Sequence, residues 1–147
     1  MIVCICSCNV SKQEKVTETK TTHVNFEKII KKWQVVNTSD CEIGLRTLDS
    51  LIRISPTSDL LTQYNHLQQR CKSELSVKYE FKLDSTVEIF SSQPTVQFWK
   101  MNNSGDSLQI LDLKKRTHIV SIKILNISDT SLVLNDGDET FNLKALK

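Results

Sequence analysis

Residues alternate between apolar and polar with a period of two through the second half of the chain, and this alternation limits the fold more than any other feature. The segment 77–83 is typical: Val77, Tyr79, Phe81 and Leu83 alternate with charged residues. Successive side chains of a strand point to opposite faces, so such a segment predicts a strand with one buried face.

Turn residues divide this region into short strands. The Asp136-Gly137 step is a strong hairpin signal, and Asn102–Asp106 is rich in the residues that favour turns. We expect eight strands. The first is at 32–37, and the other seven are at 77–83, 86–89, 95–101, 108–113, 117–125, 131–134 and 140–146. Consecutive hairpins make an antiparallel meander, and closure into a barrel would remove its two open edges.

Residues 41–75 have a helical period instead. Pro56 interrupts the pattern, and Thr57 or Ser58 is suited to cap a second helix. The apolar stripe of the first helix is Leu45, Leu48 and Ile52, and that of the second is Leu60, Tyr64, Leu67, Cys71 and Leu75. The sequence therefore predicts a mainly β protein, an antiparallel up-and-down barrel of about eight short strands with a helical insertion after the first.

Composition narrows the class of partner. The 147 residues suit one domain, and 39% hydrophobic with 24% charged residues is ordinary for a folded protein. Because 19 basic residues are balanced by 17 acidic ones, nucleic acid is not expected as the main partner. No apolar run reaches 18 residues, so no helix is expected to span a membrane.

The N-terminus concentrates cysteine. Cys4, Cys6 and Cys8 lie in an apolar segment, and the polar stretch 9–25 follows it. This order resembles the end of a bacterial lipoprotein signal peptide, with residues 5–8 as the lipobox and Cys8 as the lipidated residue. The resemblance implies a signal remnant at 1–8, a flexible tether at 9–25 and a lipid-anchored protein of the bacterial cell envelope. A frayed N-terminus of a cytoplasmic protein and a zinc site are the alternatives.

Cys41 and Cys71 remain outside that segment. In an oxidising compartment they would be able to pair as a disulfide. Cys71 also falls on the apolar stripe of the second helix, where a buried free thiol is equally compatible with the pattern.

Four segments carry a wider resemblance: Lys32–Val36 with Trp33, Tyr79–Thr86, Phe98–Met101 and Ile122–Leu134. In order and spacing they resemble the lipocalin-like domains of exported lipoproteins of the Bacteroidetes type, over about residues 26–147. Two positions depart from that pattern, because Lys31 and Ser85 stand where glycine is expected. The resemblance implies a barrel able to hold a small apolar molecule.

No segment carries a catalytic motif, so neither an enzyme nor a cofactor is expected. The three histidines are isolated in sequence. Asp136, Asp138 and Glu139 form an acidic group, which is more typical of a hairpin turn than of a cation site.

Aromatic residues on the predicted strands would either fill the barrel or line a cavity. The candidate lining residues are Trp33, Tyr79, Phe81, Phe98, Trp99 and Phe141. Two functions stay open: a membrane-anchored module that binds a small hydrophobic ligand, or an envelope structural or protein-interaction module with a filled core. A cavity volume of about 300 Å³, the lower end for ligand sites, separates them.

Overall fold

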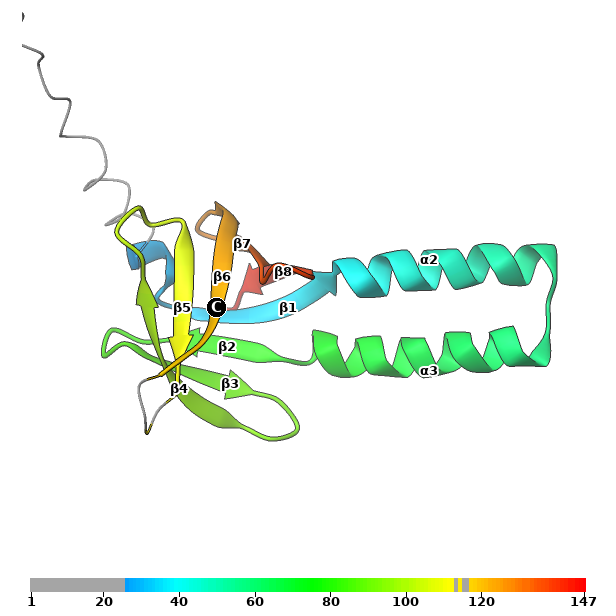
Figure 1. The fold of residues 1–147 in the computed structure, drawn as a ribbon, viewed down its shortest axis with the longest axis horizontal. Coiled ribbons are helices and arrows are strands. Elements are labelled where there is room, and N and C mark those ends of the chain that lie inside the picture. The colour runs from blue at the N-terminus through cyan, green and yellow to red at the C-terminus, as the bar shows by residue number, and fades with distance from the viewer. Residues whose placement is uncertain (1–25, 113, 115–116) are drawn as a thin grey trace, which may run out of the picture.

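The computed structural model describes residues 26–112, 114 and 117–147. Eight strands form one closed antiparallel barrel in which each strand pairs with its neighbours in sequence and β1 pairs with β8 (Figure 1). The strands are β1 (Lys32–Thr38), β2 (Lys78–Phe81), β3 (Thr86–Phe90), β4 (Thr95–Met101), β5 (Ser107–Leu111), β6 (His118–Ile127), β7 (Ser131–Asn135) and β8 (Thr140–Ala145). The predicted up-and-down barrel is confirmed.

Two antiparallel helices form a hairpin that projects from one end of the barrel (Figure 1). They are α2 (Ser39–Ile54) and α3 (Ser58–Leu75), inserted between β1 and β2 as predicted. Thr38 and Thr57 cap them, each side chain accepting a hydrogen bond from the backbone N–H three residues on. Gly44 allows the helices to approach closely, since a Cβ there would lie 2.7 Å from Leu67. Neither helix is long and apolar enough to cross a membrane.

Aromatic packing fills the barrel end opposite the helices. A helical turn over residues 26–29 lies across this end, and Phe26 stacks on Trp99 with 5.3 Å between ring centroids. Phe81 meets Trp99 edge to face, also at 5.3 Å. The indole Nε1 of Trp33 donates to the carbonyl of Ile29 at 2.9 Å, and both residues are fully buried. We call this the closed end of the barrel.

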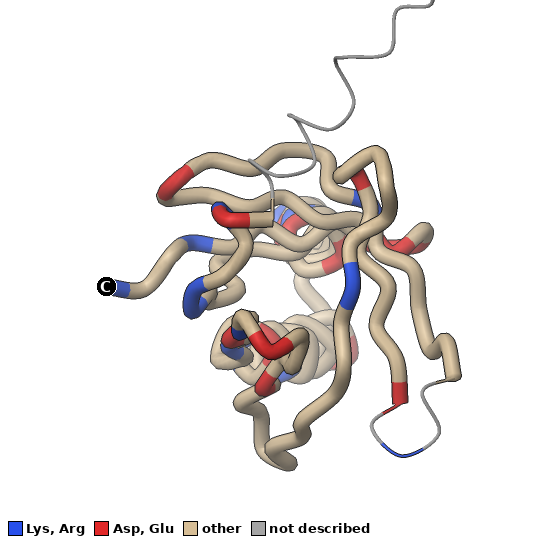
Figure 2. The backbone as a smooth tube through the Cα atoms, turned by 90° about the vertical axis from the view of Figure 1, so that its left-hand side faces the viewer, with Lys and Arg blue, Asp and Glu red and all other residues tan. Residues whose placement is uncertain are grey.

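Charged residues of both signs are spread along the described strands and loops rather than gathered in one part of the backbone (Figure 2). This distribution agrees with the balanced charge of the sequence.

Local irregularities explain where the pattern in the sequence misleads. A register shift between Val35 and Asn37 brings Thr38, not Asn37, into the interior, where it is fully buried. β2 ends at Phe81, so Leu83, predicted to continue the inward face, is 77% exposed in the following turn. That turn places Ser85 at φ 64°, the conformation that glycine adopts most easily.

Candidate functional site

A cavity of about 180 Å³ lies inside the barrel, displaced toward the end that carries the helices. Its wall consists of inward-facing side chains from seven strands, because alternate residues of each strand point into the barrel. The lining residues are Tyr79, Phe81, Val87, Ile89, Gln97, Ile110, Val120, Ile122, Leu134, Asp136, Phe141 and Leu143. The wall is predominantly apolar, with a few polar groups, which is the usual character of a site for a small molecule.

Two polar groups of the lining, Tyr79 and Asp136, lie at the strand ends nearest the helices, which we call the mouth. Tyr79 starts the inward row of β2, and Asp136 follows the last residue of β7. Gln97 lies deeper in the barrel, where it faces Val87, the partner of Phe81. Burial raises the pKa of the Tyr79 phenol, and the negative charges of Asp136 and Glu139 raise it further. The hydroxyl therefore stays protonated at neutral pH and is able to donate a hydrogen bond.

The turn between β7 and β8 fixes the acidic residues of the mouth. Asp136 Oδ1 accepts hydrogen bonds from the backbone N–H groups of Asp138 at 3.1 Å and Glu139 at 2.9 Å. Asn135 supports the same turn by donating to the Glu139 carbonyl at 3.1 Å. The acidic group thus has the role in a hairpin turn that the sequence predicts.

The turn does not provide a hydrogen-bond donor for every side-chain oxygen of Glu139. Its side-chain atom Oε1 is buried and has no hydrogen-bond partner among the residues that the structure describes. A buried acceptor without a donor costs roughly 1–3 kcal/mol, and more when the group is charged. Such an atom in a folded protein calls for a physical reason.

The six residues predicted to line the cavity fall into three places in the structure, because successive side chains of a strand point to opposite faces. Tyr79, Phe81 and Phe141 line the cavity, whereas the buried Trp33 and Trp99 belong to the packed closed end. The prediction for Phe98 is wrong. Its neighbours Gln97 and Trp99 point inward, so Phe98 lies on the outer surface of β4.

The structure joins Cys41 and Cys71 in a disulfide, with a Cα–Cα distance of 5.7 Å. The bond links the first turn of α2 to the last turn of α3, at the base of the hairpin. Glu74 lies beside it, with one carboxylate oxygen 3.1 Å from Cys41 Sγ and the other 3.1 Å from Arg70 Nε. Because the two sulfur atoms bond to each other, they are not thiolate ligands for a metal. Cys8 lies outside the described residues.

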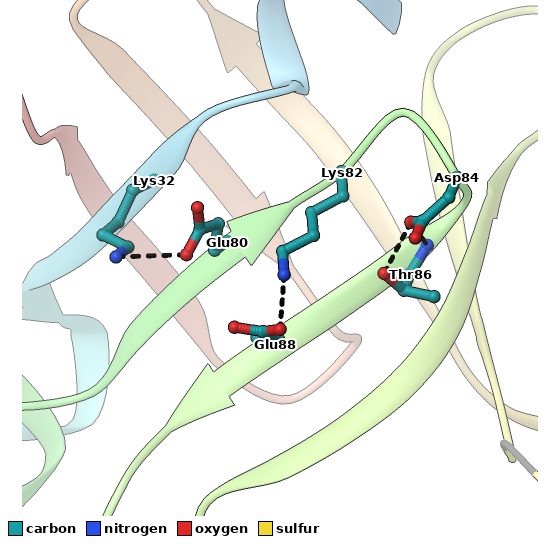
Figure 3. A network of polar contacts seen from close by, with 6 residues as sticks. All are labelled: Lys32, Glu80, Lys82, Asp84, Thr86 and Glu88. Atoms are coloured by element: carbon teal, nitrogen blue, oxygen red, sulfur yellow. Dashed lines mark hydrogen bonds and ion pairs between the residues drawn. The ribbon is translucent and has the colours of Figure 1, made fainter.

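A ladder of polar contacts crosses the outer face of β1, β2 and β3 (Figure 3). Lys32 pairs with Glu80 at 3.0 Å, and Lys82 pairs with Glu88. Glu80 and Glu88 face each other directly across the β2–β3 pair, and each lysine neutralises one of these two glutamates, which would otherwise repel. The side chains are about one-third exposed and point away from the cavity, so the ladder stabilises the sheet rather than forming a site.

Sequence reasoning missed the polar part of the cavity lining. Gln97 has no aromatic or charged group that would mark it as a lining residue. Asp136 belongs to an acidic group that is more typical of a hairpin turn than of a site. The signal that would have identified both is strand parity: Gln97 shares a face with Trp99, and Asp136 shares a face with Leu134.

The fold has solved counterparts. A DUF4847 family protein from Bacteroides vulgatus ATCC 8482 superposes with a TM-score of 0.55 at 12% identity, covering 84% of this chain and 98% of that one. A lipocalin-like protein from Bacteroides uniformis ATCC 8492 gives a TM-score of 0.48 at 13% identity, covering 81% and 99%. No protein-family model matches the sequence, and no curated protein matches it. At such identities the likeness concerns the fold alone, which is an antiparallel up-and-down barrel of eight strands.

Proposed function

We propose that the protein is an exported, lipid-anchored binding module whose barrel takes a small apolar group through the mouth. The observation that carries this proposal is the apolar cavity of about 180 Å³, with Tyr79, Gln97 and Asp136 as polar lining. Burial of the apolar group supplies the affinity, at about 25 cal/mol per Å² of apolar surface. The polar groups fix its orientation.

Volume restricts the ligand. The cavity, at about 180 Å³, lies below the roughly 300 Å³ at which sites for whole drug-sized molecules begin, so for any ligand of that size the volume criterion favours the filled-core function. A sterol, a pigment or a complete lipid would not fit inside. In another protein an apolar cavity of about 150 Å³ binds benzene, so a single ring or a short hydrocarbon chain matches this space.

Two features of the chain support export and anchoring. The segment that ends at Cys8 resembles a lipoprotein signal, and Cys41 with Cys71 forms a disulfide, the kind of bond that persists in oxidising compartments. We propose that lipid on Cys8 holds the barrel at a membrane surface. The test is the mass of the mature N-terminus from a native host, where diacyl or triacyl Cys8 is expected. An unmodified chain that still begins at Met1 would overturn the anchor.

A second function rests on a different observation. The hairpin exposes four large apolar side chains: Ile43 at 65%, Leu51 at 45%, Ile54 at 82% and Leu61 at 48%. Together with the small cavity, they favour an interaction module that uses the hairpin and has no ligand. Charged replacements at Ile43 and Ile54 should then abolish capture of a partner from envelope extracts, and leave small-molecule binding unchanged.

Small-molecule binding separates the two functions. The purified protein is titrated with benzene and with toluene while amide and methyl resonances are recorded by NMR. We expect shifts at cavity residues, and we expect Val120→Phe to abolish them because Val120 lines the cavity. Val36→Phe is the matched control, since Val36 is 48% exposed on β1 and is not a lining residue. Unchanged spectra of the wild type at saturating probe would overturn the barrel as a binding site.

A further inference from the structure

We infer that the mouth selects ligands in which the apolar group carries an amine, so that an ammonium N–H meets the carboxylate of Asp136, which lines the cavity, while Glu139 adds negative charge nearby. The inference rests on the proposed binding function and names the ligand class for that same cavity.

One carboxylate oxygen of Asp136, Oδ2, is available to accept a hydrogen bond from a ligand. Its Oδ1 is taken by the backbone N–H groups of Asp138 and Glu139, whereas the side chain is also part of the cavity wall and is exposed. No hydrogen bond to Oδ2 is recorded within the described part of the chain. A carboxylate oxygen beside an apolar cavity favours a charged donor, and such charge-assisted bonds are roughly twice as strong as neutral ones.

Glu139 adds negative charge beside the mouth. Its Oε1 is buried and lacks a donor among the described residues, so no hydrogen bond from the protein offsets the charge on that atom. The carboxylate is close enough to Tyr79 for its charge to act on the phenol, which lines the cavity. Glu139 itself is not a lining residue, so it favours a bound ammonium through its charge rather than through a direct contact.

Local charge has one sign in this turn. Residues 136–139 contribute Asp136, Asp138 and Glu139 and no basic side chain. The phenol of Tyr79 remains a neutral donor at neutral pH, because burial and the two carboxylates oppose its ionisation. A ligand with a carboxylate head would add a further negative charge beside these acidic residues, which is unfavourable near an apolar wall.

Three probes of the same shape test the inference: 2-phenylethylamine, 2-phenylethanol and 3-phenylpropionate. Each has a ring on a two-carbon arm, and only the head group differs. Calorimetric or NMR titrations of the full purified chain at pH 7 and low salt should give the amine at least tenfold tighter binding than the alcohol, and the acid the weakest binding.

Variants then locate the preference. Asp136→Asn keeps an Oδ1 that accepts the two turn hydrogen bonds, so the turn is preserved while the charge is lost. It and Glu139→Gln should each reduce amine affinity about threefold or more, and leave binding of the alcohol unchanged. Asp129→Asn, in the turn after β6 at the closed end, is the matched control and should change neither.

Each outcome is decisive. Equal binding of the three probes, or tighter binding of the acid, would overturn the ammonium preference and leave the cavity as a binding site. Failure of all three, together with benzene and toluene, would overturn the proposed function as well. An amine preference that survives in both variants would overturn the assignment to Asp136 and Glu139.

Discussion

The disulfide between Cys41 and Cys71 fastens α2 to α3 at the point where both helices leave the barrel. The bonded residues are 30 apart in sequence, so the bond limits the conformations of a long loop in the unfolded chain. On the chain-entropy account, closing a loop of this length stabilises the native state by about 3–4 kcal/mol. We expect the double variant Cys41→Ser, Cys71→Ser to lower the free energy of unfolding by that order in urea denaturation.

Reducing agent provides the internal control for this disulfide prediction. Dithiothreitol should destabilise the wild type to a similar degree and leave the double variant unaffected. Equal stability of the oxidised wild type and the variant would show that the hairpin does not depend on the bond.

Replacing Ser85 with glycine is expected to stabilise the protein. Its φ of 64° is costly for a residue with a Cβ, by about 1–2 kcal/mol. Ser85→Gly should therefore raise the free energy of unfolding by about 0.5–1 kcal/mol, after the extra entropy of glycine in the unfolded chain is subtracted. Ser92→Gly, at a position without positive φ in the β3–β4 turn, should give no gain. A loss of stability in Ser85→Gly would contradict the turn geometry.

Asp106 should titrate below the usual range. Hydrogen bonds from Asn102, Ser104 and Ser107 lower the pKa of its carboxyl, with Asn102 Nδ2 only 2.6 Å away. Asp106 thus adds stability above the ordinary carboxyl pKa of about 4, and this is lost as the pH falls through the lowered value. Asn102→Ala should raise the Asp106 pKa, measured by carboxyl ¹³C NMR. Asp84, whose pKa is lowered through Thr86, should keep its titration and serves as the reference.

Tyr79 should make the fold sensitive to alkali. Burial, together with the negative charges of Asp136 and Glu139, raises the pKa of the Tyr79 phenol in the folded protein above its ordinary value of about 10. The unfolded chain then loses its proton first, so stability is present below pH ~10 and decreases as the pH rises through the folded pKa. Tyr79→Phe should flatten this decrease in urea denaturation between pH 8 and 11. Tyr64→Phe, on α3, should retain the steep decrease; identical profiles for all three proteins would refute the assignment.

Fold prediction from sequence succeeded where local patterns agree with the tertiary structure. The alternation around Ile119–Ile124 and the stripe from Leu60 to Leu75 each have one period, and the barrel and hairpin follow them. Burial of Thr38 and exposure of Leu83 both have tertiary causes. Pairing of β1 with β8 introduces a bulge, and β2 ends at Phe81, one residue beyond the pair that Glu80 makes with Lys32, where β1 begins. Neither event leaves a local signal.

Prediction of the cavity was less complete. Aromatic character alone placed Phe98 in the lining, although its own neighbours on β4 point the other way. How far the barrel is filled depends on Phe26, which reaches Trp99 from outside the sheet. Contacts between segments so far apart in sequence have no periodic pattern, so volume and mouth became visible only in three dimensions.

The helical insertion leaves β1 and returns to β2, two strands that pair directly. Its ends are therefore as close as those of a tight turn, and Cys41 and Cys71 hold them there with 5.7 Å between Cα atoms. Lengthening, shortening or exchanging the helices would alter no strand register. The sequence and length of the α2–α3 hairpin are thus free to diverge, while the hydrogen bonds of the closed barrel maintain its shape.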